Sequence, residues 1–395
     1  MVSTNKVHGL NGTWVEPDWP PLTLDEARQL LARFPEAGEP RAILSVSPRP
    51  FSAASVIATA LGKVFVKRHH HSVRDRAGLV EEHAFVDYLI GRGAPVPRVL
   101  RTAEGASVVE DGHWSYEVHE VPAGEDVYEE ILSWTPFLSC EHACSAGQML
   151  ARMHLCAEGY DAPRRQPRPL MLGFTVFAAS DPQAEFERYL AARPALDHCK
   201  LARKVFPQAA ELLARYHEEL QPLLAQLAPL WTHNDLHGSN LLWSDRTLKA
   251  SATAMIDFGL ADRTFAVHDL AQAMERSIGE WLELKPGRED VERIPVHYDH
   301  LAALLAGYES VRPLGEIEAA ALAPMAALGH AEFALTEADY FRGVLRSEEK
   351  TRVALVEYLV GRARWFALGQ GAELVQYLRQ WARERSAAPV MVNVE

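Results

Sequence analysis

The stretch of sequence that decides the fold is His233-Asn-Asp-Leu-His-Gly-Ser-Asn240, which is followed by Ile256-Asp-Phe-Gly259. Within the first segment, Asp235 and Asn240 lie five positions apart, and this spacing suits a single loop that bends around a reaction centre. The second segment places Asp257 directly after an apolar run, at the end of a predicted strand, which is a usual position for a metal ligand. A carboxylate, an amide and a second carboxylate are therefore predicted to meet from two short segments of the chain.

Two short strands are predicted around these segments. Leu241-Leu-Trp243 reads as a buried strand, and residues 253–256 read as its partner. Phosphoryl transfer needs few protein groups: a carboxylate that orients the attacking hydroxyl, ligands for magnesium and a cation on the phosphates. An Asp with an Asn five residues later, and then an Asp before Phe-Gly, is the order that kinases use. The pattern therefore predicts phosphoryl-transfer chemistry.

The two segments resemble the motif pair of the aminoglycoside phosphotransferase and choline kinase superfamily, which also includes homoserine and hydroxylysine kinases. Position 234 is usually glycine in that superfamily, so Asn234 is a departure from its pattern. The resemblance implies that Asp235 is the catalytic base or the residue that orients the hydroxyl group. It also implies that Asn240 and Asp257 are ligands of Mg²⁺.

The same resemblance implies further residues that hold ATP or support the catalytic loop. Lys67 ends the apolar run Val64-Phe-Val-Lys67, where such a kinase places the lysine that holds the ATP phosphates. Glu82 follows fifteen residues later on a predicted helix, and we expect it to form an ion pair with Lys67. His233 is implied to support the catalytic loop, and Asp269 is implied to brace it.

The expected nucleotide site departs from the superfamily at its phosphate loop. The segment Pro48-Arg-Pro-Phe-Ser-Ala-Ala-Ser55 contains no glycine, although glycine normally lets the backbone of this loop approach the phosphates. Ser52 is a candidate phosphate donor in its place. Residues 116–124 resemble the hinge, and Glu120 and Val121 are expected to bind adenine through their backbone. The choice between ATP and GTP as donor stays open.

The order of predicted elements indicates the α+β class and a two-lobed, protein-kinase-like fold. Strands alternate with one helix up to about residue 120, and helical periodicity dominates after residues 121–124. We expect a small antiparallel sheet in the first lobe and mostly helices in the second. The predicted parts are an N-terminal arm and helix (1–40), a nucleotide-binding N-lobe (41–122) and a helical C-lobe with the catalytic loop and the acceptor site (123–395).

Composition excludes some classes of function. Forty Lys and Arg residues against 53 Asp and Glu residues give a net charge of −13, which argues against nucleic acid as the main partner. No secretory signal and no run of 18 apolar residues is visible, so we expect no membrane association and a cytoplasmic location. Four cysteines in a chain of this length do not indicate a disulfide framework. The sequence does not predict an oligomeric state.

Two other interpretations compete with an active kinase. His233, Asp235 and His237 form an H-x-D-x-H pattern that could bind zinc in a metallohydrolase, but that reading leaves Lys67 and the Ile256–Gly259 segment unexplained. A pseudokinase that binds nucleotide without turnover is the other alternative, and the loop without glycine is its only support. The run His69-His-His71 is also a conceivable metal site, although we predict that it lies in a solvated loop.

The predicted reaction is transfer of the γ-phosphoryl group of ATP to a hydroxyl group of a small metabolite or an aminoglycoside. The expected cofactors are ATP and Mg²⁺. A cationic acceptor would need carboxylates in the helical lobe, and Glu275, Glu332 and Asp339 are candidates there. The identity of the acceptor does not follow from the sequence.

Overall fold

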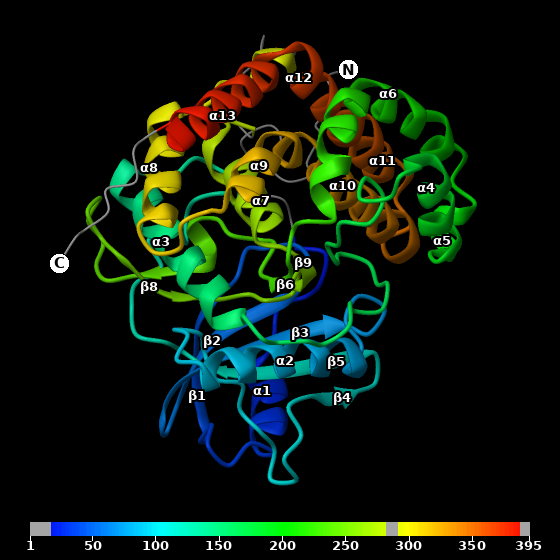
Figure 1. The fold of residues 1–395 in the computed structure, drawn as a ribbon. Coiled ribbons are helices and arrows are strands. Elements are labelled where there is room, and N and C mark those ends of the chain that lie inside the picture. The colour runs from blue at the N-terminus through cyan, green and yellow to red at the C-terminus, as the bar shows by residue number, and fades with distance from the viewer. Residues whose placement is uncertain (1–16, 282–290, 388–395) are drawn as a thin grey trace, which may run out of the picture.

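The computed structural model describes residues 17–281 and 291–387, which form two lobes (Figure 1). The smaller lobe is built on a five-stranded antiparallel sheet with the strand order β1-β2-β3-β5-β4. Its strands are β1 (Pro40–Val46), β2 (Ala53–Thr59), β3 (Gly62–His70), β4 (Val109–Asp111) and β5 (Trp114–Glu120). A small antiparallel sheet followed by a mostly helical region confirms the predicted fold class.

Two helices accompany this sheet. Helix α2 (Arg76–Gly91) begins where the Asp75 carboxylate accepts a hydrogen bond from the Gly78 amide at 2.7 Å. It buries an apolar side that includes Phe85, together with the polar side chains of Glu82 and His83. Helix α1 (Leu24–Leu31) contacts β1 and begins with the predicted capping box, which pairs Thr23 with Glu26.

The larger lobe is mostly helical (Figure 1). Its α-helices are α3 (Cys140–Ala157), α4 (Pro182–Ala191), α5 (Pro194–Asp197), α6 (Lys200–Leu224), α7 (Ala266–Ile278), α8 (Tyr298–Glu309), α9 (Glu316–Leu328), α10 (His330–Asp339), α11 (Glu348–Arg352), α12 (Gly361–Leu368) and α13 (Gln370–Ala387). Short 3₁₀ and π segments complete it: η1 (Gly238–Asn240), η2 (Val291–Arg293), η3 (Tyr340–Val344) and η4 (Val353–Val360). Within the described residues, no helix is long and apolar enough to cross a bilayer. All four cysteines are free.

Helices α3 and α8 approach each other closely at two glycines. A Cβ atom on Gly147 would lie 2.1 Å from the carbonyl oxygen of Leu304, and one on Gly307 would lie 2.0 Å from that of Cys144. Neither contact can be relieved by turning a side chain, because both involve backbone atoms. The two glycines therefore set how closely α3 and α8 pack against each other.

Two short antiparallel strand pairs in the larger lobe flank the segments 233–240 and 256–259. Strand β6 (Pro229–Thr232) pairs with β9 (Asp262–Phe265), and β7 (Leu241–Trp243) pairs with β8 (Ala252–Met255). The loop between β6 and β7 carries Asp235 and Asn240, and the loop between β8 and β9 carries Asp257. The predicted strand pair around residues 241–256 is thus present, and it places both loops at one end of the ladders.

The N-terminal segment links the two lobes across the cleft. The Asp18 amide donates to the Pro50 carbonyl at 3.1 Å, and the Trp19 indole donates to the Phe51 carbonyl at 3.1 Å. The Asp18 carboxylate accepts hydrogen bonds from Tyr340 at 2.9 Å and Lys350 at 3.0 Å in the larger lobe. The loop between β1 and β2 is therefore held in place from outside.

The run His69-His-His71 does not lie in a solvated loop as a whole. Strand β3 continues through His70, because cross-strand pairs join His69 to Ser115 and His70 to Trp114. His69 is buried, whereas His71 is exposed. The prediction is wrong for His69, since the alternation of the strand turns this side chain toward helix α2.

Candidate active site

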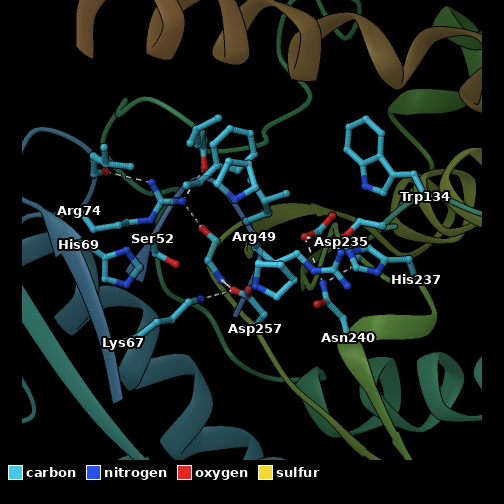
Figure 2. Close-up of a pocket in the computed structure, with 18 of the residues that line it drawn as sticks. Arg49, Ser52, Lys67, His69, Arg74, Trp134, Asp235, His237, Asn240 and Asp257 are labelled. Carbon is cyan, nitrogen blue, oxygen red and sulfur yellow. Dashed lines mark hydrogen bonds and ion pairs between the residues drawn. The ribbon is translucent and has the colours of Figure 1, made fainter. Parts of the chain in front are cut away.

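One cavity opens between the two lobes, and half of the predicted site residues line it (Figure 2). Five predicted residues contribute to its wall: Ser52, Lys67, Asp235, Asn240 and Asp257. The predicted residues Glu82, Glu120, Val121, His233 and Asp269 are not part of that wall. The structure therefore brings together the groups expected to act on phosphate and hydroxyl.

Asp235 is held by two neighbours. The Asn240 amide nitrogen donates to the Asp235 carbonyl at 2.8 Å and to its Oδ2 at 3.1 Å. The Nε atom of Arg276, a fully buried residue of α7, lies 3.0 Å from Asp235 Oδ1. Burial raises the pKa of Asp235 to about 6, although the positive charge of Arg276 opposes this. The carboxylate can therefore exchange a proton near neutral pH.

Asn234 shows why a departure from glycine is accepted in this loop. Its φ angle is 63°, in the left-handed region, where Asn is the best tolerated residue after glycine. Its side-chain oxygen accepts from Thr232 at 2.9 Å, and its amide donates to the carbonyls of Leu172 and Leu260. The Asn side chain thus ties the catalytic loop to two neighbouring segments, which glycine could not do.

Asp269, at the first turn of α7, braces the loop through its backbone. Its two carboxylate oxygens accept from the amides of His233 and Asn234, both at 2.8 Å, and Oδ2 also lies 3.1 Å from Nε2 of the buried His154. Burial opposes ionisation, but the hydrogen bond and charge of His154 hold the pKa of Asp269 below its usual value. Asp269 therefore ties two backbone amides of this loop to α7, and its bracing role stays a prediction.

His233 uses both ring nitrogens within the loop. Its Nδ1 accepts from the Asp235 amide at 3.1 Å, and its Nε2 lies 2.9 Å from the Ile256 carbonyl. These contacts support the loop and leave no lone pair for a metal. The H-x-D-x-H zinc site is therefore not formed, because one of its three ligands is committed to the backbone.

Lys67 pairs with a residue other than the one expected. Its Nζ lies 2.7 Å from Asp257 Oδ1 (Figure 2), whereas Glu82 lies 3.5 Å from Nη2 of the buried Arg165. Burial opposes the charge on Lys67, but Asp257 raises the pKa of Lys67 to about 12. Lys67 in turn lowers the pKa of Asp257 to about 2 against the effect of burial. The expected Lys67–Glu82 pair is wrong for this structure, because Arg165 competes for Glu82.

A buried carboxylate beside Lys67, that of Glu117, was not expected. Glu117 is the cross-strand partner of Lys67 and accepts from the Nε2 atoms of His69 at 2.9 Å, His83 at 2.7 Å and His119 at 2.9 Å. Hydrogen bonds and charge from these rings keep its pKa well below the usual range, although burial acts in the opposite direction. Alternation along residues 115–119 indicates which side chains share a face, but only the strand register shows that Glu117 faces Lys67.

Arg98 forms two hydrogen bonds with Glu120 of the expected hinge. The Glu120 amide donates to the Arg98 carbonyl at 2.9 Å, and the Glu120 carboxylate accepts from the Arg98 side chain at 2.6 Å. Glu120 is exposed at the end of β5, and Val121 follows it directly. Binding of adenine by the backbone of these two residues stays a prediction.

Arg49, Trp134 and Phe333 also belong to the cavity wall and were not predicted. Arg49 extends from the loop between β1 and β2, and its Nη2 donates to the Ile131 carbonyl at 3.2 Å. Trp134 packs edge-on against Phe333 with ring centroids 5.1 Å apart, and its φ angle of 66° is rare for a bulky residue. No local sequence pattern identifies these residues, since each reaches the cavity from a separate loop or helix.

The chemistry of the cavity wall fits a magnesium ion. Because the Asn240 amide nitrogen is committed to Asp235, its oxygen is available as a ligand. Asp257 is ionised, and 40% of its side chain is exposed to the cavity. Carboxylate and amide oxygens are the ligands that hard divalent cations prefer. Asn240 and Asp257 are therefore suited to hold Mg²⁺.

The two-lobed fold and the residues at its cavity define a kinase-like phosphotransferase. A family model described as the Phosphotransferase enzyme family matches residues 51–314, and the chain belongs to this family. A homoserine kinase of Gluconobacter oxydans is 27% identical over 256 residues, which cover 64% of this chain and 67% of that protein. The predicted resemblance is thereby confirmed.

Solved structures show the same fold. A microcompartment-associated aminopropanol kinase superposes with a TM-score of 0.55 at 18% identity, covering 91% of this chain and 98% of the other. An amicoumacin kinase in complex with AMP-PNP and Ca²⁺ superposes with a TM-score of 0.53 at 15% identity, covering 87% and 94%. These structures show the kinase-like fold, and the family match identifies the chain as a small-molecule kinase of this family.

Proposed function

We propose that this protein transfers the γ-phosphoryl group of ATP to a hydroxyl group of a small metabolite. The observation that carries the proposal is the shared cavity wall of Lys67, Asp235, Asn240 and Asp257. These four residues supply each group that phosphoryl transfer needs from a protein. The similarity to a homoserine kinase and the kinase structures supports the same reaction class.

Asp235 acts on the acceptor in this proposal. Its carboxylate orients the hydroxyl group and takes up its proton as the new bond to phosphorus forms. The Asn240 and Arg276 contacts fix the carboxylate, so little reorganisation is needed when the acceptor arrives. A pKa of about 6 leaves most of the Asp235 carboxylate ionised at neutral pH.

Lys67, Asn240 and Asp257 act on the nucleotide. Lys67 donates to the phosphates, and Asn240 and Asp257 hold Mg²⁺. When bound, this cation neutralises charge on the phosphates. Because Lys67 and Asp257 are paired in this structure, both must exchange partners when the nucleotide and the cation bind.

The charges of the cavity favour a metabolite over an aminoglycoside as acceptor. Among the described residues of the wall, the only carboxylates are those of Asp235 and Asp257, and both are committed to the reaction. The acidic residues considered for a cationic acceptor contact other groups: Glu275 pairs with Arg362, Glu332 accepts from Thr175 and Val176, and Asp339 lies near Arg193. A polycationic acceptor would therefore find no spare carboxylate at this wall.

A substrate screen tests the proposal. Purified protein with Mg·ATP is offered homoserine, amino alcohols, sugars, nucleosides and aminoglycosides, and acceptor-dependent release of ADP is measured. We expect release with one class of small hydroxyl compound and none with aminoglycosides. The Asp235→Asn variant is the control for contaminating kinases. Absence of ADP release and of Mg·ADP binding would contradict the proposed activity.

A further inference from the structure

The loop between β1 and β2 offers few backbone donors for a phosphate. Pro48 and Pro50 have no N–H group. The Ser47 amide donates to the Ala54 carbonyl at 2.8 Å, and the Arg49 amide donates to the Ser47 hydroxyl at 3.3 Å. Positions 47–50 therefore cannot cradle phosphate oxygens with their backbone, as a glycine-rich loop does.

The Arg49 side chain enters the cavity from this loop. Figure 2 shows Arg49 in the cavity between Ser52 of the smaller lobe and Asp235 of the larger lobe. Burial lowers the pKa of Arg49, and the negative charges of Asp126, Asp235 and Asp257 oppose that effect. The guanidinium group therefore lies in the field of three carboxylates, two of which, Asp235 and Asp257, line the same cavity.

The loop that carries Arg49 is anchored on several sides. Prolines at positions 48 and 50 restrict φ on both sides of Arg49. The Phe51 ring packs edge-on against Tyr340, with centroids 5.2 Å apart, and Trp19 and Asp18 bind the loop carbonyls from outside. Arg49 is therefore presented from a fixed backbone, which is the condition for electrostatic preorganisation.

We propose that Arg49 is a catalytic residue that contacts the γ-phosphoryl group during its transfer and neutralises its developing charge. This proposal rests on the proposed kinase activity. In the step, the bond between the γ-phosphorus and its bridging oxygen breaks, and the electron pair leaves with ADP. A bond forms between phosphorus and the acceptor oxygen, whose proton passes to Asp235. Arg49 keeps its protons and supplies charge and paired donors, as planar guanidinium groups do for phosphate.

Binding of a transition-state mimic separates this role from ordinary nucleotide binding. We compare wild type, Arg49→Gln and Arg49→Lys. Arg101→Gln is the control, because Arg101 is a partly exposed residue of the same lobe that does not line the cavity. Isothermal titration calorimetry gives the affinity for Mg·ADP alone and for Mg·ADP with fluoroaluminate, which imitates the transferring group. Thermal unfolding of each variant confirms that it is folded.

We expect Arg49→Gln to bind Mg·ADP within about threefold of wild type, because the contact is made to the transferring group. Its gain in affinity from fluoroaluminate should fall by about 10²-fold or more, in line with the loss of a transition-state donor. Arg49→Lys should be intermediate, since an ammonium keeps the charge without the paired donors. The control should match wild type.

The outcomes distinguish the proposed kinase activity from the proposed role of Arg49. Failure of wild type to bind Mg·ADP would overturn the proposed kinase activity itself. If wild type and Arg49→Gln bind Mg·ADP equally and show the same ratio with fluoroaluminate, the activity stands and the role of Arg49 is refuted. A folded Arg49→Gln variant that loses Mg·ADP binding to the same extent would show a ground-state contact, which also refutes the transition-state role.

Discussion

Replacing Asp235 by Asn should stabilise the protein while it removes most of the turnover. Asp235 has a pKa raised to about 6 from an ordinary value of 3.8, chiefly by burial. Ionisation of this group is therefore less favourable in the folded chain than in the unfolded chain. At about 1.4 kcal/mol for each pKa unit, the full cost is about 3 kcal/mol. Because 18% of the side chain reaches the cavity, we expect a gain of about 2 kcal/mol in Asp235→Asn.

The pH dependence of this gain has a definite sign. Below pH 3.8 the carboxyl group is protonated in both states, so it costs nothing. As the pH rises from 3.8 to about 6, the unfolded state loses its proton first, and the wild type loses stability relative to the Asn variant. Above about pH 6 the difference is constant. The favourable pair with Arg276 acts in the opposite direction and is already included in the net pKa.

Urea unfolding at pH 5 and pH 8 measures the effect. The Asn variant should have the higher free energy of unfolding at both values, with the larger difference at pH 8, and its turnover should fall by about 10²–10⁴-fold. Asp161→Asn, at a residue with an 84% exposed side chain, is the matched control and should change little. A variant less stable than wild type at pH 8 would refute the reasoning, since it would show that the lost pair with Arg276 outweighs the relief of burial.

Three other perturbations follow from the same site. Lys67→Ala should raise the ATP KM and lower kcat together. Glu82→Gln should act mainly on stability, because Glu82 lies beside Arg165. Equal kinetic losses in the two variants would instead support a functional Lys67–Glu82 ion pair. Activity should vanish with EDTA and return with Mg²⁺ or Mn²⁺, and recovery with zinc in the absence of nucleotide would instead favour a hydrolase. Asp269→Asn should lower the free energy of unfolding in urea by about 2–5 kcal/mol, because the new amide places a donor against the N–H group of His233 or Asn234. An unchanged free energy of unfolding would show that these hydrogen bonds contribute little to stability.

The sequence predicted best those groups whose spacing is local. Asp235 and Asn240 belong to one loop, and Asp257 follows a short strand that pairs next to it, so their meeting depends on few long-range contacts. The fold class was predictable for a related reason, since the change from alternating to helical periodicity near residues 121–124 is visible in the chain itself. Both predictions therefore rest on patterns that can be read within one continuous stretch of the sequence.

The prediction failed where several partners compete for one charge. Lys67 and Glu82 have the right spacing for an ion pair, yet Arg165, more than eighty residues away in sequence, lies beside Glu82. Glu117 was overlooked because a strand pattern does not specify which residue of a neighbouring strand faces Lys67. Competition among buried charges is decided by the three-dimensional register, which no local pattern contains.

The pairing of Lys67 with Asp257 links nucleotide binding to cation binding. Lys67 is buried and pairs with Asp257 at 2.7 Å. A cation that bound Asp257 without a nucleotide would therefore remove this partner from the Lys67 ammonium group. Because 40% of the Asp257 side chain is exposed, the larger cost falls on the buried Lys67. Leaving a buried charge without its partner is costly, and a bound nucleotide supplies a new partner for Lys67. The protein should therefore bind nucleotide and divalent cation together more tightly than either one separately, which places the two ligands required for phosphoryl transfer in the cleft at the same time.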